Sequence, residues 1–575
     1  MRRNAGTFSF SATEVAAFLA CPHLTSLELR VAEGELTRPA QNDIERRLLE
    51  KRGLEHEARV LEHYKKLGRE IVTIGARPGT QGLRAAFDKT LEVMAAGADL
   101  IYQGTLLTQS EDGTSWVGRP DFLQKVQGGG GHWPHHYEPV DAKLSREAKA
   151  QAVLQLCAYA DQLAAVQGAR PARFHIIGGG GAIEPLALWS ADYGAYFRDV
   201  RRRMRGFVVE AAGGPEPYPE PVYHCSVCRY WKRCEERRRA DDHLSLVAGI
   251  TRRQRDRLVL AGVQQLEQLA TRDAATRVDG IVSESLERIS QQAALQLRAR
   301  RTQQACYELL TNEASGVGLE ALPAPTPGDL FLDLEGDSFV TDGGLEYLFG
   351  LLDFGEPELD SFIIRDSPGP ARYRAFWATT AAEEKRAFEQ VIDRVMLGRR
   401  EFVDLHVYHF GHREADALKK LSCRHATREA EVDQLLRDGT LVDLLPVVRH
   451  GLRASVESYS LKELEALHDF RRSTDLRDAA RAMQLFGWWL ETGDEAVPLL
   501  ELRSAIQSYN RDDCLSTARL RDFLEARRPE LEAIVGRSLA RPERRKEEPP
   551  PRLTERQQLA ADLAGRLTAD AAHAQ

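Results

Sequence analysis

Two short apolar runs, at residues 117–122 and 137–143, constrain the fold of this chain more than any other feature. A glycine-rich loop separates them, and two strand-like runs around such a loop predict a β-hairpin. The first run carries Asp121, and the second ends with Asp141 and Lys143. Side chains two positions apart on a strand point to the same side of the sheet. We therefore expect Asp121, Asp141 and Lys143 to lie close together.

These three side chains have the chemistry of a phosphodiesterase site. Paired carboxylates hold divalent cations such as Mg²⁺ or Mn²⁺, which activate water for attack on a phosphate. An ammonium group beside them offsets the negative charge that develops during the attack. A hairpin with ordinary surface charge is the alternative interpretation, because an Asp-x-Lys motif is short enough to recur by chance.

The length and charge of the chain limit what kind of protein it is. With 575 residues the chain is too long to fold around a single hydrophobic core, so roughly three or four domains are expected. It has neither an apolar run near the ~18 residues that cross a bilayer nor a secretory signal, which predicts a cytoplasmic protein without a membrane partner. The net charge is −8, so a nucleic acid would have to bind local basic surface, such as residues 229–239 or 252–257. A P-loop motif is absent from the sequence, so no ATP-driven motor is recognisable.

A cluster of cysteines predicts a metal site. Cys225, Cys228 and Cys234 form a C-x2-C-x5-C motif in a polar segment. Structural zinc sites and iron–sulfur clusters take four ligands, so a fourth thiol is expected. Cys21 is the best candidate, and such a site would clasp the two ends of the domain together. The residue types leave iron–sulfur and zinc open as alternatives.

Side chains on two predicted helices extend the candidate site. The helix predicted at 146–166 places Gln155 and Tyr159 one turn apart on one face, and the helix predicted at 43–66 carries His56. In isolation, a core tyrosine and a structural histidine are the ordinary interpretations of such residues.

In their order and spacing, these motifs resemble the RecB-type PD-(D/E)xK nucleases over about residues 10–240. The resemblance is greatest to members with a four-cysteine 4Fe–4S clasp, such as the CRISPR-adaptation exonuclease and the AddB nuclease domain. It is carried by Gly53, His56, Gly118 to Asp121, Asp141 to Lys143, Gln155, Tyr159, Cys21, Cys225, Cys228 and Cys234.

This resemblance implies a role for each motif. His56, Asp121 and Asp141 would hold Mg²⁺ or Mn²⁺, and Lys143 would orient the attacking water. The glutamine and tyrosine on the helix after the hairpin would support the site and touch the DNA, and the four cysteines would hold the iron–sulfur cluster. The implied substrate is a DNA end or a single strand.

A second set of carboxylates follows a proline-rich break at residues 322–328. The apolar run after the break places Asp333 and Glu335 on one face of a predicted strand. Far downstream, a predicted helix carries Tyr509 and Asp513 one turn apart. This combination resembles the RNase H-like DEDD exonucleases of the tyrosine type, including YprB-like proteins, over about residues 328–528. The resemblance implies that the three carboxylates bind two metal ions and that the tyrosine positions the water.

The middle motif departs from that family. In place of the expected aspartate, the chain offers Glu414, with Asp416 as the alternative, and Asp443 is either a supporting carboxylate or a strand-end charge. Because two-metal geometry is exacting, binding of nucleic acid without cleavage stays open for this domain.

The sequence thus predicts an α/β multidomain protein. A restriction-endonuclease-like PD-(D/E)xK domain is expected at 1–240 and an RNase H-like domain at 328–528. Between them, residues 241–322 are expected to be helical, either as a helix-hairpin-helix or as a plain linker. A linker with a C-terminal helix is expected at 529–575. The predicted function is a metal-dependent deoxyribonuclease in DNA repair, recombination or defence. The alternatives are a non-cleaving single-strand-binding module that works with a partner superfamily 1 helicase, and a zinc-stabilised RNA-processing protein.

Overall fold

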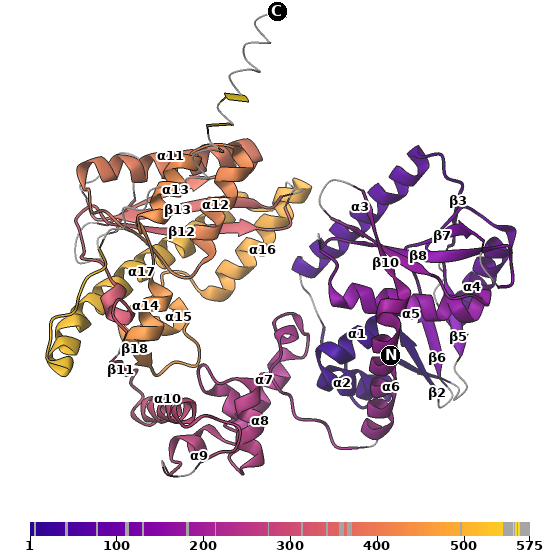
Figure 1. Cartoon of the computed structure of the whole chain (residues 1–575), viewed down its shortest axis with the longest axis horizontal. Coiled ribbons are helices and arrows are strands. Elements are labelled where there is room, and N and C mark those ends of the chain that lie inside the picture. The colour runs from indigo at the N-terminus through magenta and orange to yellow at the C-terminus, as the bar shows by residue number, and fades with distance from the viewer. Residues whose placement is uncertain are drawn as a thin grey trace, which may run out of the picture. The chain divides into compact units, whose positions relative to one another are not determined.

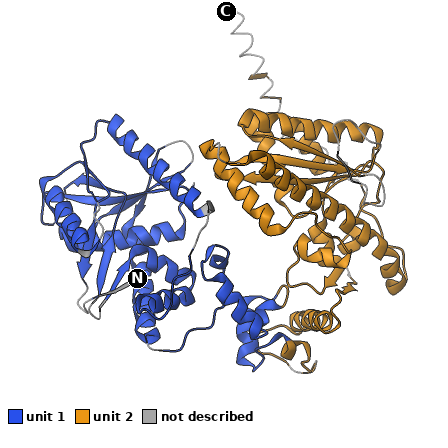
Figure 2. Ribbon diagram, turned by 180° about the vertical axis from the view of Figure 1, so that it is seen from behind, with its two compact units in different colours: residues 1–246, 250–266 blue, residues 247–249, 267–575 orange. Residues whose placement is uncertain are grey.

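The computed structural model divides the chain into two compact units (Figure 2). Residues 1–246 and 250–266 form the first unit, and residues 247–249 and 267–575 form the second. The structure describes all residues except 5–6, 41–43, 76–78, 110–113, 129–130, 146, 180–182, 213, 274, 276, 312–313, 341–342, 356–361, 365–370, 495–496, 544–555, 557, 560–561 and 564–575. The linker and helix predicted beyond residue 543 therefore lie largely outside the described residues.

The first unit contains two sheets with helices around them. The four-stranded sheet has the order β1 (Arg2–Asn4), β2 (Thr7–Ser11), β6 (Ser115–Gly118) and β5 (Leu106–Gln109). The six-stranded sheet has the order β10 (Pro185–Trp189), β9 (Arg173–Gly178), β8 (His135–Lys143), β7 (Phe122–Gln127), β4 (Leu100–Tyr102) and β3 (Ile71–Thr73). The helices are α1 (Ala12–Ala20), α2 (Pro22–Ala32), α3 (Ile44–Lys66), α4 (Gly79–Ala96), α5 (Ala150–Gln167), α6 (Ser190–Ala211), α7 (Trp231–Ala240) and α8 (Arg252–Leu260), with 3₁₀-helices η1 (Tyr223–Val227) and η2 (Leu244–Leu246). Helix α5 contributes much of the core, because Leu156, Ala160 and Leu163 on it are fully buried.

The predicted hairpin is present, but its first strand begins only at Phe122. Strand β7 pairs antiparallel with β8, with Phe122 opposite Val140. The residues before it form β6, which belongs to the other sheet and pairs with β2 and β5. Between β6 and β7 lies Pro120, which cannot donate a ladder hydrogen bond. The chain therefore changes sheets just before Asp121.

The second unit is built on one mixed six-stranded sheet. Its order is β14 (Phe362–Ile364), β15 (Ala371–Trp377), β13 (Leu345–Asp353), β12 (Leu330–Asp337), β16 (Val407–His409) and β17 (Leu441–Asp443). The main helices are α11 (Ala381–Glu401), α12 (Arg413–His425), α13 (Glu429–Arg437), α14 (Leu444–Gly451), α15 (Leu461–Leu464), α16 (Leu476–Thr492) and α17 (Leu499–Val535). Strand β12 pairs antiparallel with β13 and parallel with β16.

Alternation along β12 decides where its carboxylates lie. Leu330, Leu332 and Leu334 pack with α11, α12 and α13, whereas Phe331 packs with α14 and α17. Figure 1 shows α11 and α17 on opposite sides of this sheet. Because residues two apart share a face, Asp333 and Glu335 lie on the α17 side.

The region predicted as a helical linker is shared between the units. Helix α8 belongs to the first unit, α9 (Leu266–Ala270) begins at the boundary, and α10 (Ser283–Thr302) belongs to the second. A strand, β11 (Tyr307–Leu309), follows α10 and pairs with β18 (Leu452–Ala454) inside the second unit. Within the described part of the chain, no helix combines the length and apolar character required to cross a membrane.

Candidate functional site

Three carboxylates of the second unit converge on one point. Ligand oxygens of Asp333, Glu335 and Asp513 all lie within 4.8 Å of one another, and in the described part of the chain no other trio of histidine, cysteine, aspartate or glutamate side chains is this close. The first two come from β12 and the third from α17, where Tyr509 precedes it by one turn. The structure thus brings together the residues that sequence periodicity selected. Oxygen donors at this spacing are the ligands that Mg²⁺ and Mn²⁺ prefer.

The electrostatics of this cluster favour a bound cation. Burial, followed by the charges of Asp513 and Glu335, raises the pKa of Asp333 well above its ordinary value. Burial and the charge of Asp513 raise the pKa of Glu335 to about 8. The pKa of Asp513 is also raised by burial, although Arg472 acts in the opposite direction. A divalent cation would relieve this repulsion, so the residues present fit a metal ion.

Glu414, at the start of α12, lies near the cluster, and Asp416 does not take its place. Glu414 is 4% exposed, and its charge contributes to the raised pKa of Asp333. Its Oε2 atom is buried without a hydrogen-bond donor, because His409 Nδ1, 3.6 Å away, lies 2.7 Å from the carbonyl oxygen of Gly411 instead. A carboxylate oxygen that is buried without a hydrogen-bond donor is free to act as an additional metal ligand. Asp416 is about half exposed and pairs with Lys419.

Asp443 has a structural position. Its Oδ1 accepts hydrogen bonds from the backbone N–H groups of Gly411 at 2.8 Å and Leu445 at 2.9 Å. It therefore caps α14 and fixes the loop between β16 and α12. This position corresponds to the strand-end charge that the sequence left open.

Sequence reasoning missed Asn510, which orients Asp333. The fully buried Asn510 donates from Nδ2 to Asp333 Oδ2 at 2.6 Å, and its Oδ1 accepts from the Tyr373 hydroxyl at 2.8 Å. Gly350 of β13, opposite Asp333, makes room for it, because a Cβ atom there would collide with Asn510 Oδ1. The position of Asn510 directly after Tyr509 was the only available signal.

Cations also surround the acidic cluster. The Arg472 guanidinium donates to Asp513 Oδ1 and to Glu465 Oε1, each at 2.5 Å. The Lys462 ammonium group lies 5.0 Å from the centre of the Tyr509 ring. Both cations come from the long segment between β18 and α17, which carries no recognisable motif. They place positive charge where a phosphate would approach.

In the first unit, the structure brings Asp121, Asp141 and Lys143 together. Lys143 Nζ forms an ion pair with Asp141 Oδ2 at 2.6 Å. The Ala142 N–H donates to Asp121 Oδ2 at 2.8 Å, and the Asp121 N–H lies 3.4 Å from Asp141 Oδ1. Burial and the charge of Asp141 raise the pKa of Asp121 well above its ordinary value, although Lys143 opposes them. The two carboxylates thus crowd each other at the end of the hairpin.

His56 lies on α3 with both ring nitrogens near protein partners. Nε2 is 3.2 Å from the Ile177 carbonyl oxygen, and Nδ1 is 3.5 Å from Arg59 Nη2. The neighbouring Glu57, 8% exposed, is the residue of this helix whose charge adds to the raised pKa of Asp121. Glu57 was missed by sequence reasoning, and the structure offers it as a further carboxylate of this site.

Gln155 and Tyr159 share the face of α5 that looks toward the loop before Asp121. Gln155 Nε2 donates to the Tyr159 hydroxyl at 2.8 Å, which donates to the Arg119 carbonyl oxygen at 3.1 Å. All three residues line one cavity. The predicted pair therefore supports the loop that carries Asp121.

Four cysteines surround another cavity of the first unit. Cys21, Cys225, Cys228 and Cys234 are free thiols that line one small cavity. Burial raises the pKa of Cys234 to about 11, and the charges of the other three thiols act in the same direction. Among these described residues no three sulfur atoms lie within 4.8 Å of one another, whereas one tetrahedral zinc ion would hold its sulfurs about 3.8 Å apart. The thiols converge, but with a wider spacing than a single zinc ion requires.

Comparison with known protein families supports the RNase H-like domain predicted in the second unit. Residues 330–525 match the model of the RNase H superfamily. A search of curated proteins found no match. The matched segment begins at β12 and ends within α17, so it contains the complete carboxylate cluster. The chain is a mixed α/β protein whose second unit contains an RNase H-like domain.

Proposed function

We propose that this chain is a divalent-metal-dependent deoxyribonuclease that acts on DNA ends or single strands. The observation that carries the proposal is the convergence of Asp333, Glu335 and Asp513 inside a segment that matches the RNase H superfamily. The match supports a nuclease domain, and the buried carboxylates supply the ligands that phosphodiester hydrolysis needs.

Each residue of the second site has a proposed task. Asp333, Glu335 and Asp513 would hold Mg²⁺ or Mn²⁺, which supplies Lewis-acid charge and a nucleophilic water at neutral pH. Tyr509, which borders the cluster, would orient the attacking water. Arg472 and Lys462 would offset charge on the phosphate. Glu414 would act as an additional ligand in the role of the family's middle aspartate.

For the first unit we propose a RecB-type PD-(D/E)xK nuclease site. Asp121 and Asp141 would hold the cation, with His56 or its neighbour Glu57 as the ligand from α3. Lys143 would orient the water and neutralise charge on the scissile phosphate. Gln155 and Tyr159 would support the loop and contact the strand.

The cysteine cavity supports an iron–sulfur clasp. The four thiols come from opposite ends of the first unit and line one cavity, and four thiolates are the ligand set of a 4Fe–4S cluster. In this role the cluster would hold α2 against the η1–α7 segment.

DNA repair, recombination or defence are the proposed settings, with a superfamily 1 helicase as a candidate partner. A second candidate function is single-strand binding without cleavage by the RNase H-like unit. It is favoured by Glu414, because a longer side chain replaces the family's aspartate at an exacting position.

A nuclease assay on end-labelled single and double strands tests these proposals. Asp141→Ala and Asp333→Ala should each remove one activity, and the double variant should remove both. Full cleavage by the double variant would contradict both sites, whereas binding without cleavage by the wild type would support the binding function.

A further inference from the structure

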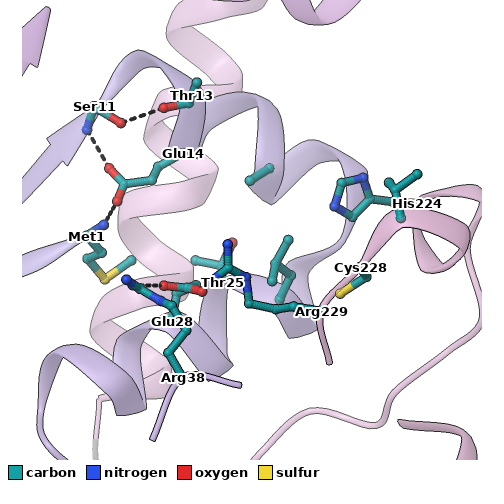
Figure 3. A pocket seen from close by; sticks show the side chains of 13 residues that line it. Met1, Ser11, Thr13, Glu14, Thr25, Glu28, Arg38, His224, Cys228 and Arg229 are labelled. Atoms are coloured by element: carbon teal, nitrogen blue, oxygen red, sulfur yellow. Dashed lines mark hydrogen bonds and ion pairs between the residues drawn. The ribbon is translucent and has the colours of Figure 1, made fainter. Parts of the chain in front are cut away.

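Two neighbouring cavities of the first unit form a continuous groove. One is lined by Arg119, Gln155 and Tyr159 of the candidate site, and it reaches the N-terminal end of α1. The other shares Ser11, Thr13 and Glu14 with the first. Its far end is lined by His224, Cys228 and Arg229 (Figure 3). The groove therefore runs from Tyr159, whose hydroxyl contacts the loop before Asp121, to the cysteine segment.

The acidic groups along this groove already have partners within the protein. Glu28 forms an ion pair with Arg38, and Glu14 accepts a hydrogen bond from the Ser11 backbone N–H, as the dashed lines in Figure 3 show. Hydroxyl groups of Ser11, Thr13 and Thr25 line the rest of the wall. A polyanion would therefore meet hydroxyl groups and carboxylates that already accept hydrogen bonds or form ion pairs.

Exposed aromatic side chains flank His224, Cys228 and Arg229, the residues that line this end of the groove. Tyr223 of η1 is 98% exposed, and Trp231, the first residue of α7, is 44% exposed. Large apolar side chains that are exposed together in one short segment favour a binding role, and Val227 between them is exposed as well. Aromatic faces stack with bases of any sequence, and each stacked base adds to affinity.

Two cations beside these rings have no carboxylate partner among the described residues. They are Arg229 and Lys232, and Lys232 Nζ lies 5.8 Å from the centre of the Trp231 ring. The next cation, Arg233, differs because it pairs with Glu216 at 3.0 Å. Free cations interleaved with exposed rings match the alternating phosphates and bases of an unpaired strand.

We propose that the ledge formed by Tyr223, Arg229, Trp231 and Lys232 binds an unpaired nucleic-acid strand and delivers it along the groove to Tyr159, beside the loop that carries Asp121. This inference rests on the proposed nuclease function of the first unit and adds its substrate path. Bases stack on Tyr223 and Trp231, and phosphates run past Arg229 and Lys232.

Binding of a fluorescent oligothymidine to the full chain tests the ledge. Fluorescence anisotropy is measured with protein carrying Asp141→Ala and Asp333→Ala, so that hydrolysis does not consume the probe. Tyr223→Ala should weaken binding about tenfold, as expected for the loss of one stacked base. Lys232→Ala should also lower the salt dependence of binding, by about 0.7 in the slope of log affinity against log salt. Because Tyr223 is almost fully exposed, its replacement leaves the fold intact.

Tyr196→Ala is the matched control, because this tyrosine on α6 is 53% exposed and lines neither cavity of the groove. It should bind the oligomer like the parent protein. Equal losses for Tyr196→Ala and Tyr223→Ala, or unchanged binding by Tyr223→Ala, would overturn the ledge. The ledge would also be overturned if duplex DNA bound as tightly as the oligomer and Tyr223→Ala did not weaken that binding.

The two levels of proposal fail differently. Wild-type protein that binds the oligomer through Tyr223 but never shortens it would refute the nuclease function and leave the ledge standing. Cleavage that persists while Tyr223→Ala binds normally would refute the ledge alone. A photo-crosslink from a thiothymidine oligomer to residues 223–232 is the independent readout, and its absence would count against the ledge.

Discussion

Arg472 and Asp513 form a buried ion pair at the centre of the RNase H-like site. The guanidinium donates to Asp513 Oδ1 at 2.5 Å, and the two side chains are 8% and 12% exposed. The same guanidinium binds Glu465, so one protein cation serves two carboxylates. Arg472 thus reduces the repulsion among the metal ligands, and it occupies one oxygen of a residue that the metal also needs.

Arg472→Ala should therefore make the fold depend more on metal. Removing the guanidinium leaves two carboxylates unpaired, which costs about 3–5 kcal/mol in the free energy of unfolding without metal. Added Mn²⁺ should recover more of the loss than it contributes to the wild type, because it restores positive charge at Asp513. Calorimetric melting with EDTA and with Mn²⁺ measures this difference. Arg374→Ala, which removes one of the two arginines that pair with Asp353 elsewhere in the sheet, should also destabilise the fold but be unresponsive to Mn²⁺.

Glu335 should make the metal-free protein less stable as the pH rises. Its pKa is raised from 4.5 to about 8 in the folded protein, first by burial. Between these values the folded protein keeps a proton that the unfolded chain has released, so the free energy of unfolding falls as the pH increases. Glu335→Gln cannot ionise, and in EDTA at pH 9 it should exceed the wild type by ~1 kcal/mol or more, which is about 2–4 °C in Tm.

Glu383→Gln provides the opposite control for this pH series. Hydrogen bonds from Thr379 lower the pKa of Glu383, so its carboxylate stabilises the fold above its ordinary pKa. The variant should therefore lose a little stability at neutral pH. If Glu335→Gln and the wild type had the same pH profile of stability, the pKa of Glu335 would not differ between the folded and unfolded states.

Asn510→Ala should weaken metal binding without removing any ligand. The lost amide no longer holds Asp333 Oδ2, and loss of such a partner typically lowers metal affinity or activity by about 10–100-fold. Titration calorimetry with Mn²⁺, on protein carrying Asp141→Ala, isolates the second site. Gln507, on the same helix, accepts a hydrogen bond from Trp377 instead of contacting a metal ligand. Gln507→Ala should therefore leave the affinity for Mn²⁺ unchanged. Equal affinities in the two variants would remove Asn510 from the site.

The second site was predictable where local periodicity determines it. Strand alternation places Asp333 and Glu335 on one face, and one helical turn aligns Tyr509 with Asp513. Arg472 was not predictable, because it meets Asp513 across 41 residues of chain without a motif. Its position depends on how the segment before α16 packs against α17, which no short pattern encodes.

The first unit shows two different limits of sequence reasoning. Neighbouring residues on a helix point about 100° apart, so the sequence could not decide whether His56 or Glu57 faces Asp121. The change of sheet before Asp121 was within reach, because Pro120 interrupts the predicted strand and proline is excluded from central ladders. The meeting of Asp141 with Lys143 follows from alternation alone.

Lys143→Ala should abolish cleavage by the first unit while DNA binding persists. Although burial opposes it, the charge of Asp141 raises the pKa of Lys143, so the side chain stays protonated at neutral pH. Loss of such a charge at the reacting phosphate costs about 10²–10³ in rate. The assay needs an Asp333→Ala background, so that the second unit does not mask the loss. Lys125→Ala, on β7 and paired with Asp99, is the matched control and should cut normally. Normal cleavage by Lys143→Ala would exclude this lysine from the mechanism.

The four thiols of the first unit should bind iron when the protein is purified without oxygen. Thiolate-to-iron absorbance in the visible range should accompany iron and sulfide in the analysis, whereas zinc is colourless. Cys225→Ser should lose the absorbance and lower the Tm of the first unit, because the clasp between Cys21 and the η1–α7 segment opens. Cys423→Ser, an exposed thiol of the second unit, should keep both the colour and the Tm. Stoichiometric zinc in the colourless wild type would refute the iron–sulfur cluster, while leaving the convergence of the thiols explained by another metal.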